Sequence, residues 1–173
     1  MKINIGCGKQ TWDGFYCVDA VNHPKATRPL DLAHAFVFKG EQLTNPLPLS
    51  DGVASEVHNY HFIEHFYRWE SPAVLREFHR LLQPVGKLIM ELPDIEKCAR
   101  NLLKQAKDQL CMWGFYGDPG WQDHYMCHRW GYTAVSISAL LIDSGFTRIS
   151  VLPPETHGAR VDRDMRIEAI KGK

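Results

Sequence analysis

The sequence has 173 residues, with 20 Lys and Arg against 20 Asp and Glu, so its formal net charge at pH 7 is zero. Hydrophobic residues make up 45% and charged residues 23%, which is the balance of a globular domain rather than of a disordered chain. The length predicts a single domain, residues 1–173, and the balanced charge gives no general attraction to nucleic acid or to an anionic membrane.

Cysteine usage and hydropathy bear on the compartment. The five cysteines, at positions 7, 17, 98, 111 and 127, are odd in number and contain no C-x-x-C pair. Reduced thiols and a cytoplasmic location are therefore expected. No apolar run approaches the roughly 20 residues that cross a bilayer, and the first residues lack the apolar stretch of a secretory signal peptide.

Two short strands open the chain and lie close together in sequence. Residues 2–5 and 15–18 are β-prone, and they end at Gly6 and Asp19 respectively. About ten residues separate them, which is fewer than the crossover between parallel strands usually takes. We therefore expect the first crossover helix to be reduced or absent.

The rest of the chain alternates between strand and helix signals, which predicts an α/β fold. One helix should begin with Ser71 as its N-cap and Pro72 as its first helical residue, and should end before Pro84. The further strands are expected at 28–32, 53–60, 87–92, 148–152 and 165–170.

Two more helices flank a long segment rich in aromatic residues. One helix should run from its cap Asp94 to Leu110, and another from Thr133 to Gly145, which suits a left-handed C-terminal cap. Between them, residues 111–132 are predicted as a long loop that forms a substrate lid, covers a sheet edge or makes a homodimer contact. Its aromatic residues are Trp113, Phe115, Tyr116, Trp121, Tyr125 and Trp130.

Gly6, Gly8 and Asp19 form the motif that points to chemistry. The two glycines follow the first strand directly and let the backbone turn sharply and approach a ligand. Asp19 ends the neighbouring strand, where a carboxylate can accept hydrogen bonds from both hydroxyls of a ribose. The motif therefore predicts a nucleoside site. A dinucleotide fingerprint would need glycine at position 11, which is Thr11, so a nicotinamide cofactor fits poorly.

Further blocks follow this motif in a fixed order. They are Gly14-Phe15, 47–51, 61–65, 75–84 with Gly86 and Leu88, Pro93-Asp94, His128 and Gly145-Phe146. Together with residues 4–8 and Val18-Asp19 they resemble the class I S-adenosylmethionine-dependent methyltransferases, in particular small bacterial methyltransferases of the type 11 kind. The resemblance implies a Rossmann-like three-layer sandwich around a mostly parallel seven-stranded sheet whose last strand is antiparallel.

The resemblance also implies S-adenosylmethionine as the cofactor. The residues implied in binding it are Gly6, Cys7 and Gly8 against the methionine part, Asp19 at the ribose, Asp31 and Leu32 beside the adenine, and Asn59 and His61 near the sulfonium.

Methyl transfer is a direct displacement, so the protein must hold the acceptor in line and, where the acceptor is protonated, supply a base. Histidine is the expected base, with His128 as the first candidate and His61 as the second. Tyr125 and Trp130 would bind the acceptor. That acceptor is expected to be a small molecule or a glycan, and no nucleic-acid partner is expected.

Two zinc patterns are weaker interpretations. The segment His61-x-x-Glu64-His65 matches H-x-x-E-H, in which two helical histidines bind zinc, but no downstream carboxylate ligand is evident. His65 is expected instead to make a packing hydrogen bond. A second group, Cys111, His124, Cys127 and His128, fits no standard zinc-finger spacing. No metal site is therefore expected.

The sequence departs from the family pattern at Gln10, Ser55 and Val85, which stand where the family has glycine, aspartate and glycine. These departures leave open a second function, namely a non-catalytic domain that binds S-adenosylmethionine weakly or not at all and works by interaction. The retained Asp19, the loop histidines and the complete central block favour the active enzyme. Three arginines near the C-terminus, Arg160, Arg163 and Arg166, should form a solvated face, with the binding of an anionic acceptor as the alternative.

Overall fold

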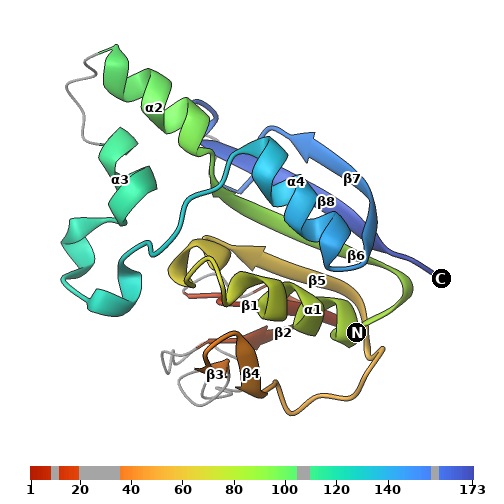
Figure 1. The fold of residues 1–173 in the computed structure, drawn as a ribbon. Helices are drawn as coiled ribbons and strands as arrows, with labels where there is room; N and C mark the ends of the chain where they lie inside the picture. The colour runs from red at the N-terminus through yellow and green to blue at the C-terminus, as the bar shows by residue number, and fades with distance from the viewer. Residues whose placement is uncertain (9–11, 20–35, 105–109, 157–159) are drawn as a thin grey trace.

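A single sheet organises the domain (Figure 1). In the computed structural model, the structure describes all residues except 9–11, 20–35, 105–109 and 157–159. Six strands form the sheet in the order β2-β1-β5-β6-β8-β7. Their bounds are Lys2–Ile5 (β1), Phe15–Val18 (β2), Ala54–Tyr60 (β5), Leu82–Pro93 (β6), Phe146–Leu152 (β7) and Asp164–Lys171 (β8).

The strand directions match the predicted fold class. β1 pairs in parallel with β2 and β5, β5 pairs in parallel with β6, and β8 runs antiparallel to both β6 and β7. The α/β class, the mostly parallel sheet and the antiparallel last strand are confirmed. Seven strands were expected, and the sheet has six among the described residues; the strand expected at 28–32 lies outside them. A separate antiparallel hairpin, β3 (Val37–Lys39) and β4 (Gln42–Asn45), is not predicted by the sequence pattern.

The first crossover is as short as expected. Its described residues, 6–8 and 12–14, form turns and no helix. The backbone N–H groups of Gly6 and Cys7 both donate to the carbonyl oxygen of Val18, at 2.8 and 3.3 Å. These bonds hold the end of β1 against the end of β2.

The apolar core lies on one face of the sheet, beneath helices α1 (Ser71–Leu81) and α4 (Ala134–Asp143) (Figure 1). Strand alternation places Ile3, Ile5 and Val57 on this face, and all three are fully buried. α1 contributes side chains spaced three and four apart, as an amphipathic helix requires; they are Val74, Leu75, Phe78 and Leu81. None of the described helices is long and apolar enough to span a membrane.

The start of α1 differs from the prediction. Glu70, not Ser71, is the N-cap, and Ser71 is already helical. The Ser71 hydroxyl donates to the carbonyl of Tyr67 at 3.1 Å and accepts a 2.6 Å bond from the buried Tyr132 hydroxyl. Because these two bonds occupy it, the hydroxyl does not cap the helix. β6 then begins at Leu82, five residues earlier than expected, and runs through Pro84 and Gly86.

The segment between β6 and α4 is more helical than the sequence indicates. α2 (Ile95–Leu103) has the predicted cap, since Asp94 accepts a hydrogen bond from the backbone of Glu96, but it ends at Leu103 rather than at Leu110. Residues 111–132 are not a plain loop. They start within α3 (Leu110–Tyr116) and continue through the 3-10 turns Pro119–Trp121 and His124–Met126. α4 has its predicted cap Thr133, and Gly145 has a φ of +95°.

Candidate functional site

The glycine bend, residues 6–8, meets the carboxylate that ends β2. Gly6 and Gly8 both have positive φ, 70° and 52°, as their sequence position suggests. The backbone N–H of Gly8 donates to Oδ2 of Asp19 over 2.5 Å. The bend and the carboxylate therefore converge on one place at the carboxyl edge of the sheet.

The two glycines of the bend serve different ends. A Cβ at Gly6 would collide with the ring of Phe62, so packing alone requires glycine there. A Cβ at Gly8 would have nothing within 4 Å among the described residues. In the described part of the chain, Gly8 thus has no neighbour on this side, unlike Gly6.

Cys7 lies between them and is buried. Burial, and to a smaller extent the charge of Asp19, raise the pKa of the Cys7 thiol to about 12. The thiol keeps its proton at neutral pH, so Cys7 can offer a ligand its backbone but no thiolate.

Asn59 lies next to the bend, because β5 aligns it with Ile5 of β1. Its side chain is 1% exposed, and neither its amide nitrogen nor its amide oxygen has a hydrogen-bond partner among the described residues. Buried amides are rarely left without partners in folded proteins. The Asn59 amide is thus a polar group in place for a ligand at this edge.

A second group of residues, which we call the charge cluster, consists of His61, Glu64, His65, His128 and Asp164. His61 follows β5 in a left-handed conformation, with a φ of 52°. Its Nδ1 lies 3.1 Å from Glu64 Oε1, and its Nε2 lies 3.4 Å from Asp164 Oδ2. Burial alone would lower the pKa of His61, but these two carboxylates outweigh burial and raise it to about 9.

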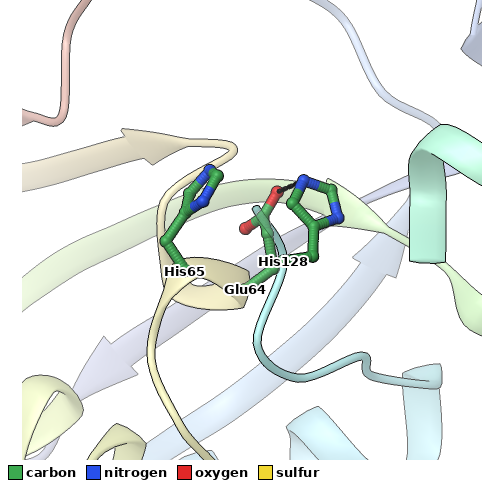
Figure 2. A group of neighbouring side chains, drawn as sticks. All are labelled: Glu64, His65 and His128. Carbon is green, nitrogen blue, oxygen red and sulfur yellow. Dashed lines mark ion pairs between the residues drawn. The ribbon is translucent and has the colours of Figure 1, made fainter. Parts of the chain in front are cut away.

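Glu64 stands at the centre of this cluster (Figure 2). It is fully buried in the 3-10 turn Ile63–His65. Burial alone would raise its pKa, but the interactions with His61, and the smaller effects of the other two histidines, lower the pKa to about 2. Sequence reasoning did not single out Glu64, and the H-x-x-E-H spacing was the only signal for it.

His128 reaches the cluster from a distant segment. Its Nδ1 lies 3.0 Å from the carbonyl oxygen of Gly114, and its Nε2 lies 4.0 Å from Glu64 Oε1 (Figure 2). His65 makes the packing hydrogen bond expected of it, 3.3 Å from Nδ1 to the carbonyl oxygen of Cys127. The two histidines named as candidate bases, His61 and His128, thus face the same carboxylate.

The C-terminal arginines are not a solvated face. Arg163 is buried and its guanidinium donates to both oxygens of Asp164, at 2.6 and 2.8 Å. Arg166 is also buried, and pairs with Glu168 at 2.8 Å and with Glu91 at 3.4 Å. The acidic partners, which lie on β6 and β8, neutralise these charges, so the prediction for Arg163 and Arg166 was wrong.

The remaining predicted residues lie in different surroundings. Trp130 is 45% exposed and lines, with His128 and Phe115, a cavity of about 350 Å³. Tyr125 is 66% exposed and rests against His124, with ring centroids 4.2 Å apart. Asp31 and Leu32 lie outside the described residues.

Comparison with known proteins identifies the fold. No family model and no curated protein matches the sequence. A solved S-adenosylmethionine-dependent methyltransferase from Methanosarcina mazei is similar, with a TM-score of 0.59, 16% identity, and 99% of this chain covering 92% of that one. A Burkholderia thailandensis 1,6-didemethyltoxoflavin-N1-methyltransferase, solved with S-adenosylhomocysteine, is also similar, with a TM-score of 0.56 and 13% identity. The match covers 99% of this chain and 71% of that one.

A third similar structure is a possible exported protein from Bordetella parapertussis, with a TM-score of 0.58 and 15% identity. This chain, matched over 99% of its residues, spans only 61% of that protein. Identities this low establish the architecture and not the activity. The chain has the Rossmann-like fold of the class I S-adenosylmethionine-dependent methyltransferases.

Proposed function

We propose that this chain binds S-adenosylmethionine at the carboxyl edge of β1, β2 and β5 and transfers its methyl group to a small molecule or a glycan. The observation that carries the proposal is the hydrogen bond from Gly8 to the Asp19 carboxylate, which joins the glycine bend to the acidic end of β2. A carboxylate in this position of a Rossmann-like fold can accept the two hydroxyls of a ribose.

The residues present fit that cofactor. No described residue would meet a side chain at Gly8, and the buried Asn59 amide supplies a donor and an acceptor that no described residue uses. In its described residues the first crossover has no helix whose N-terminus could hold a phosphate. A nucleoside with an amino-acid tail suits such a site better than a dinucleotide does. The roles of Asp31 and Leu32 beside the adenine stay predictions.

S-adenosylmethionine supplies an electrophilic methyl group, so the chain's own residues need only orient the acceptor, exclude water and manage a proton. His61 holds its proton at neutral pH between two carboxylates and is a poor base. His128 is the better placed of the two candidates, since its Nδ1 faces a carbonyl and its Nε2 lone pair is available to a proton or to a cation. Trp130 lines the same cavity of about 350 Å³ as His128 and is therefore the better placed residue to contact the acceptor. The role of Tyr125 in binding the acceptor stays a prediction.

Calorimetric titration with S-adenosylmethionine and S-adenosylhomocysteine tests the proposal. The wild-type chain should bind both ligands. Asp19→Asn should lower the affinity about tenfold to a hundredfold, because a charge-assisted hydrogen bond contributes about 1.5–3 kcal/mol. The matched control is Asp143→Asn, an exposed residue at the end of α4, which should bind like the wild type.

Absence of heat from either ligand, with a folded protein by circular dichroism, would overturn the proposal and favour an interaction domain without the cofactor. If binding occurs, incubation with labelled S-adenosylmethionine and pools of small molecules or glycans identifies the acceptor class. Binding that is never followed by turnover with any pool would favour the non-catalytic alternative.

A further inference from the structure

Three side chains of the charge cluster form a set of metal-binding donors. Glu64 and His65 come from the turn after β5, and His128 comes from the segment before α4. One donor atom of each lies within 4.8 Å of the donor atoms of the other two. Figure 2 shows the Glu64 carboxylate between the rings of His65 and His128.

The two histidines are held in the state that binds a metal. His65 Nδ1 faces the carbonyl of Cys127 at 3.3 Å, and His128 Nδ1 faces the carbonyl of Gly114 at 3.0 Å. A carbonyl oxygen can only accept, so Nδ1 carries a proton in both rings, and in the neutral ring Nε2 is the atom that keeps the lone pair. A backbone carbonyl that fixes the tautomer in this way is the usual support of a metal-bound histidine.

Glu64 provides the third donor group, a carboxylate with one engaged oxygen and one oxygen without a partner among the described residues. Its Oε1 faces His61 at 3.1 Å, whereas its Oε2 is buried with no hydrogen-bond partner among the described residues. An ionised carboxylate buried in this way is costly unless a positive charge or a donor reaches it. A bound cation would satisfy the unpartnered oxygen.

We propose that Glu64, His65 and His128 bind one divalent transition-metal ion of the zinc, cobalt or iron(II) class. Two imidazole nitrogens and one carboxylate oxygen suit these ions, whereas magnesium prefers a shell of oxygen ligands. Because metal–donor bonds are about 2.0–2.2 Å long, the three donors must move inward from the separations seen here. Side-chain rotations would have to bring the three donors together.

The site would keep a coordination position for a small molecule. Zinc takes four ligands, and the chain offers three, so at least one position is open. His128 also lines the cavity of about 350 Å³ beside Trp130, so this cavity adjoins one of the three ligand residues. His61, fixed by Asp164, orients Glu64 as a positioning residue.

This donor set differs from the zinc patterns weighed in the sequence. In H-x-x-E-H the ligands would be His61 and His65, but His61 is engaged by two carboxylates here. The set also replaces the expectation that the chain has no metal site. It stands independently of cofactor binding, because none of its three donors belongs to the glycine bend. His128 is shared with the proposed function, since a ring whose Nε2 binds a metal cannot also serve as the base.

Titration of the chelator-treated 173-residue chain tests the site, with Zn²⁺ followed by calorimetry and Co²⁺ by its visible absorption. The wild type should bind one equivalent of each, and Mg²⁺ should give no heat. Glu64→Gln and His128→Ala should each lower the Zn²⁺ affinity a hundredfold or more. The control is His124→Ala, an exposed histidine of the same segment, which should bind Zn²⁺ like the wild type.

If Glu64→Gln does not fold, His128→Ala and His65→Ala decide the matter, with circular dichroism as the folding check. A folded wild type that binds neither Zn²⁺ nor Co²⁺ would overturn the proposal, as would an affinity unchanged in His128→Ala or a preference for Mg²⁺. Asp19→Asn should keep full Zn²⁺ binding. Loss of the cofactor site and loss of the metal site are therefore separable results.

Discussion

The glycine bend and the charge cluster lie at the same end of the domain but are assembled differently. The bend and its partner Asp19 come from one short stretch of sequence, and backbone N–H groups make the contacts. The charge cluster joins three separate parts of the chain through side chains such as Glu64, His128 and Asp164. The first depends on local backbone geometry, and the second exists only once the whole fold is in place.

The two regions also differ in charge. At the bend, the one carboxylate that meets the backbone accepts a backbone N–H. In the cluster, two buried carboxylates are offset by His61 and Arg163, and each charge was removed from water to reach its place. Breaking a buried charge pair is costly because it leaves the partner uncompensated. The cluster should therefore be far more sensitive to loss of a charge than the bend.

Asp164→Asn tests that difference and should have the largest effect. It leaves the buried Arg163 and the half-buried His61 with one carboxylate fewer, so the free energy of unfolding should fall by about 3–5 kcal/mol. Asp19→Asn, which keeps an acceptor for the Gly8 N–H, should lower it by about 1 kcal/mol. Urea unfolding of both variants and of the exposed control Asp143→Asn measures the three values. Similar losses for Asp164→Asn and Asp19→Asn would contradict the distinction between the regions.

A pair of alanine variants separates the structural role of Gly6 from the ligand-binding role proposed for Gly8. Gly6→Ala should lower the free energy of unfolding by about 2–4 kcal/mol, since it adds a clash with Phe62 to the strain of a positive φ. Gly8→Ala should cost only about 1 kcal/mol of strain, yet weaken S-adenosylhomocysteine binding. Combining Gly6→Ala with Phe62→Ala should recover the steric part. If the losses in the free energy of unfolding of the two single variants simply add in the double variant, the clash with Phe62 is not the reason that position 6 requires glycine.

The parts of the fold that could be predicted from the sequence are those that depend on neighbouring residues, and the parts that could not depend on packing between distant segments. β1, β2, α4 and the caps Asp94 and Thr133 follow from patterns within a few residues, and the structure confirms them. α3 was missed because glycine and aromatic residues are weak helix formers. Packing overrides that tendency: Gly114 lies so close to Cys98 of α2 that any larger residue would clash.

In the candidate site, too, the residues of local patterns could be predicted and those brought together by the fold could not. Gly6, Gly8 and Asp19 could be identified because turn residues after a strand and an acid at the end of the next one form a local pattern. No spacing rule links Glu64 to His128 or Asp164, so the sequence could not predict that these residues lie together. Likewise, the sequence shows the charge of Arg166 but not that Glu91, 75 residues away, lies beside it.

The smallest predicted effect concerns His58, which lies on β5, where its register partner on β1 is Asn4. It is buried, with Nε2 2.8 Å from Glu56 and Nδ1 2.9 Å from the Tyr60 hydroxyl. Burial lowers its pKa below 6.5, and the nearby Arg166 and Lys2 act in the same direction. Glu56, its only carboxylate partner in the described part of the chain, opposes this shift without reversing it.

A folded-state pKa below the unfolded value means that folding favours neutral His58. Its contribution to stability should be complete above about pH 6.5 and should be lost as the pH falls through the folded-state pKa, by about 1.4 kcal/mol for each unit of lowering. Urea unfolding of wild type and His58→Gln at pH 7.5 and at pH 5 measures this. The wild-type advantage should shrink at the lower pH, whereas exposed His124→Ala should differ from wild type equally at both. If acidification instead enlarged the advantage, the Glu56 partner would outweigh burial, and a single carboxylate would suffice to hold a charged histidine in this sheet.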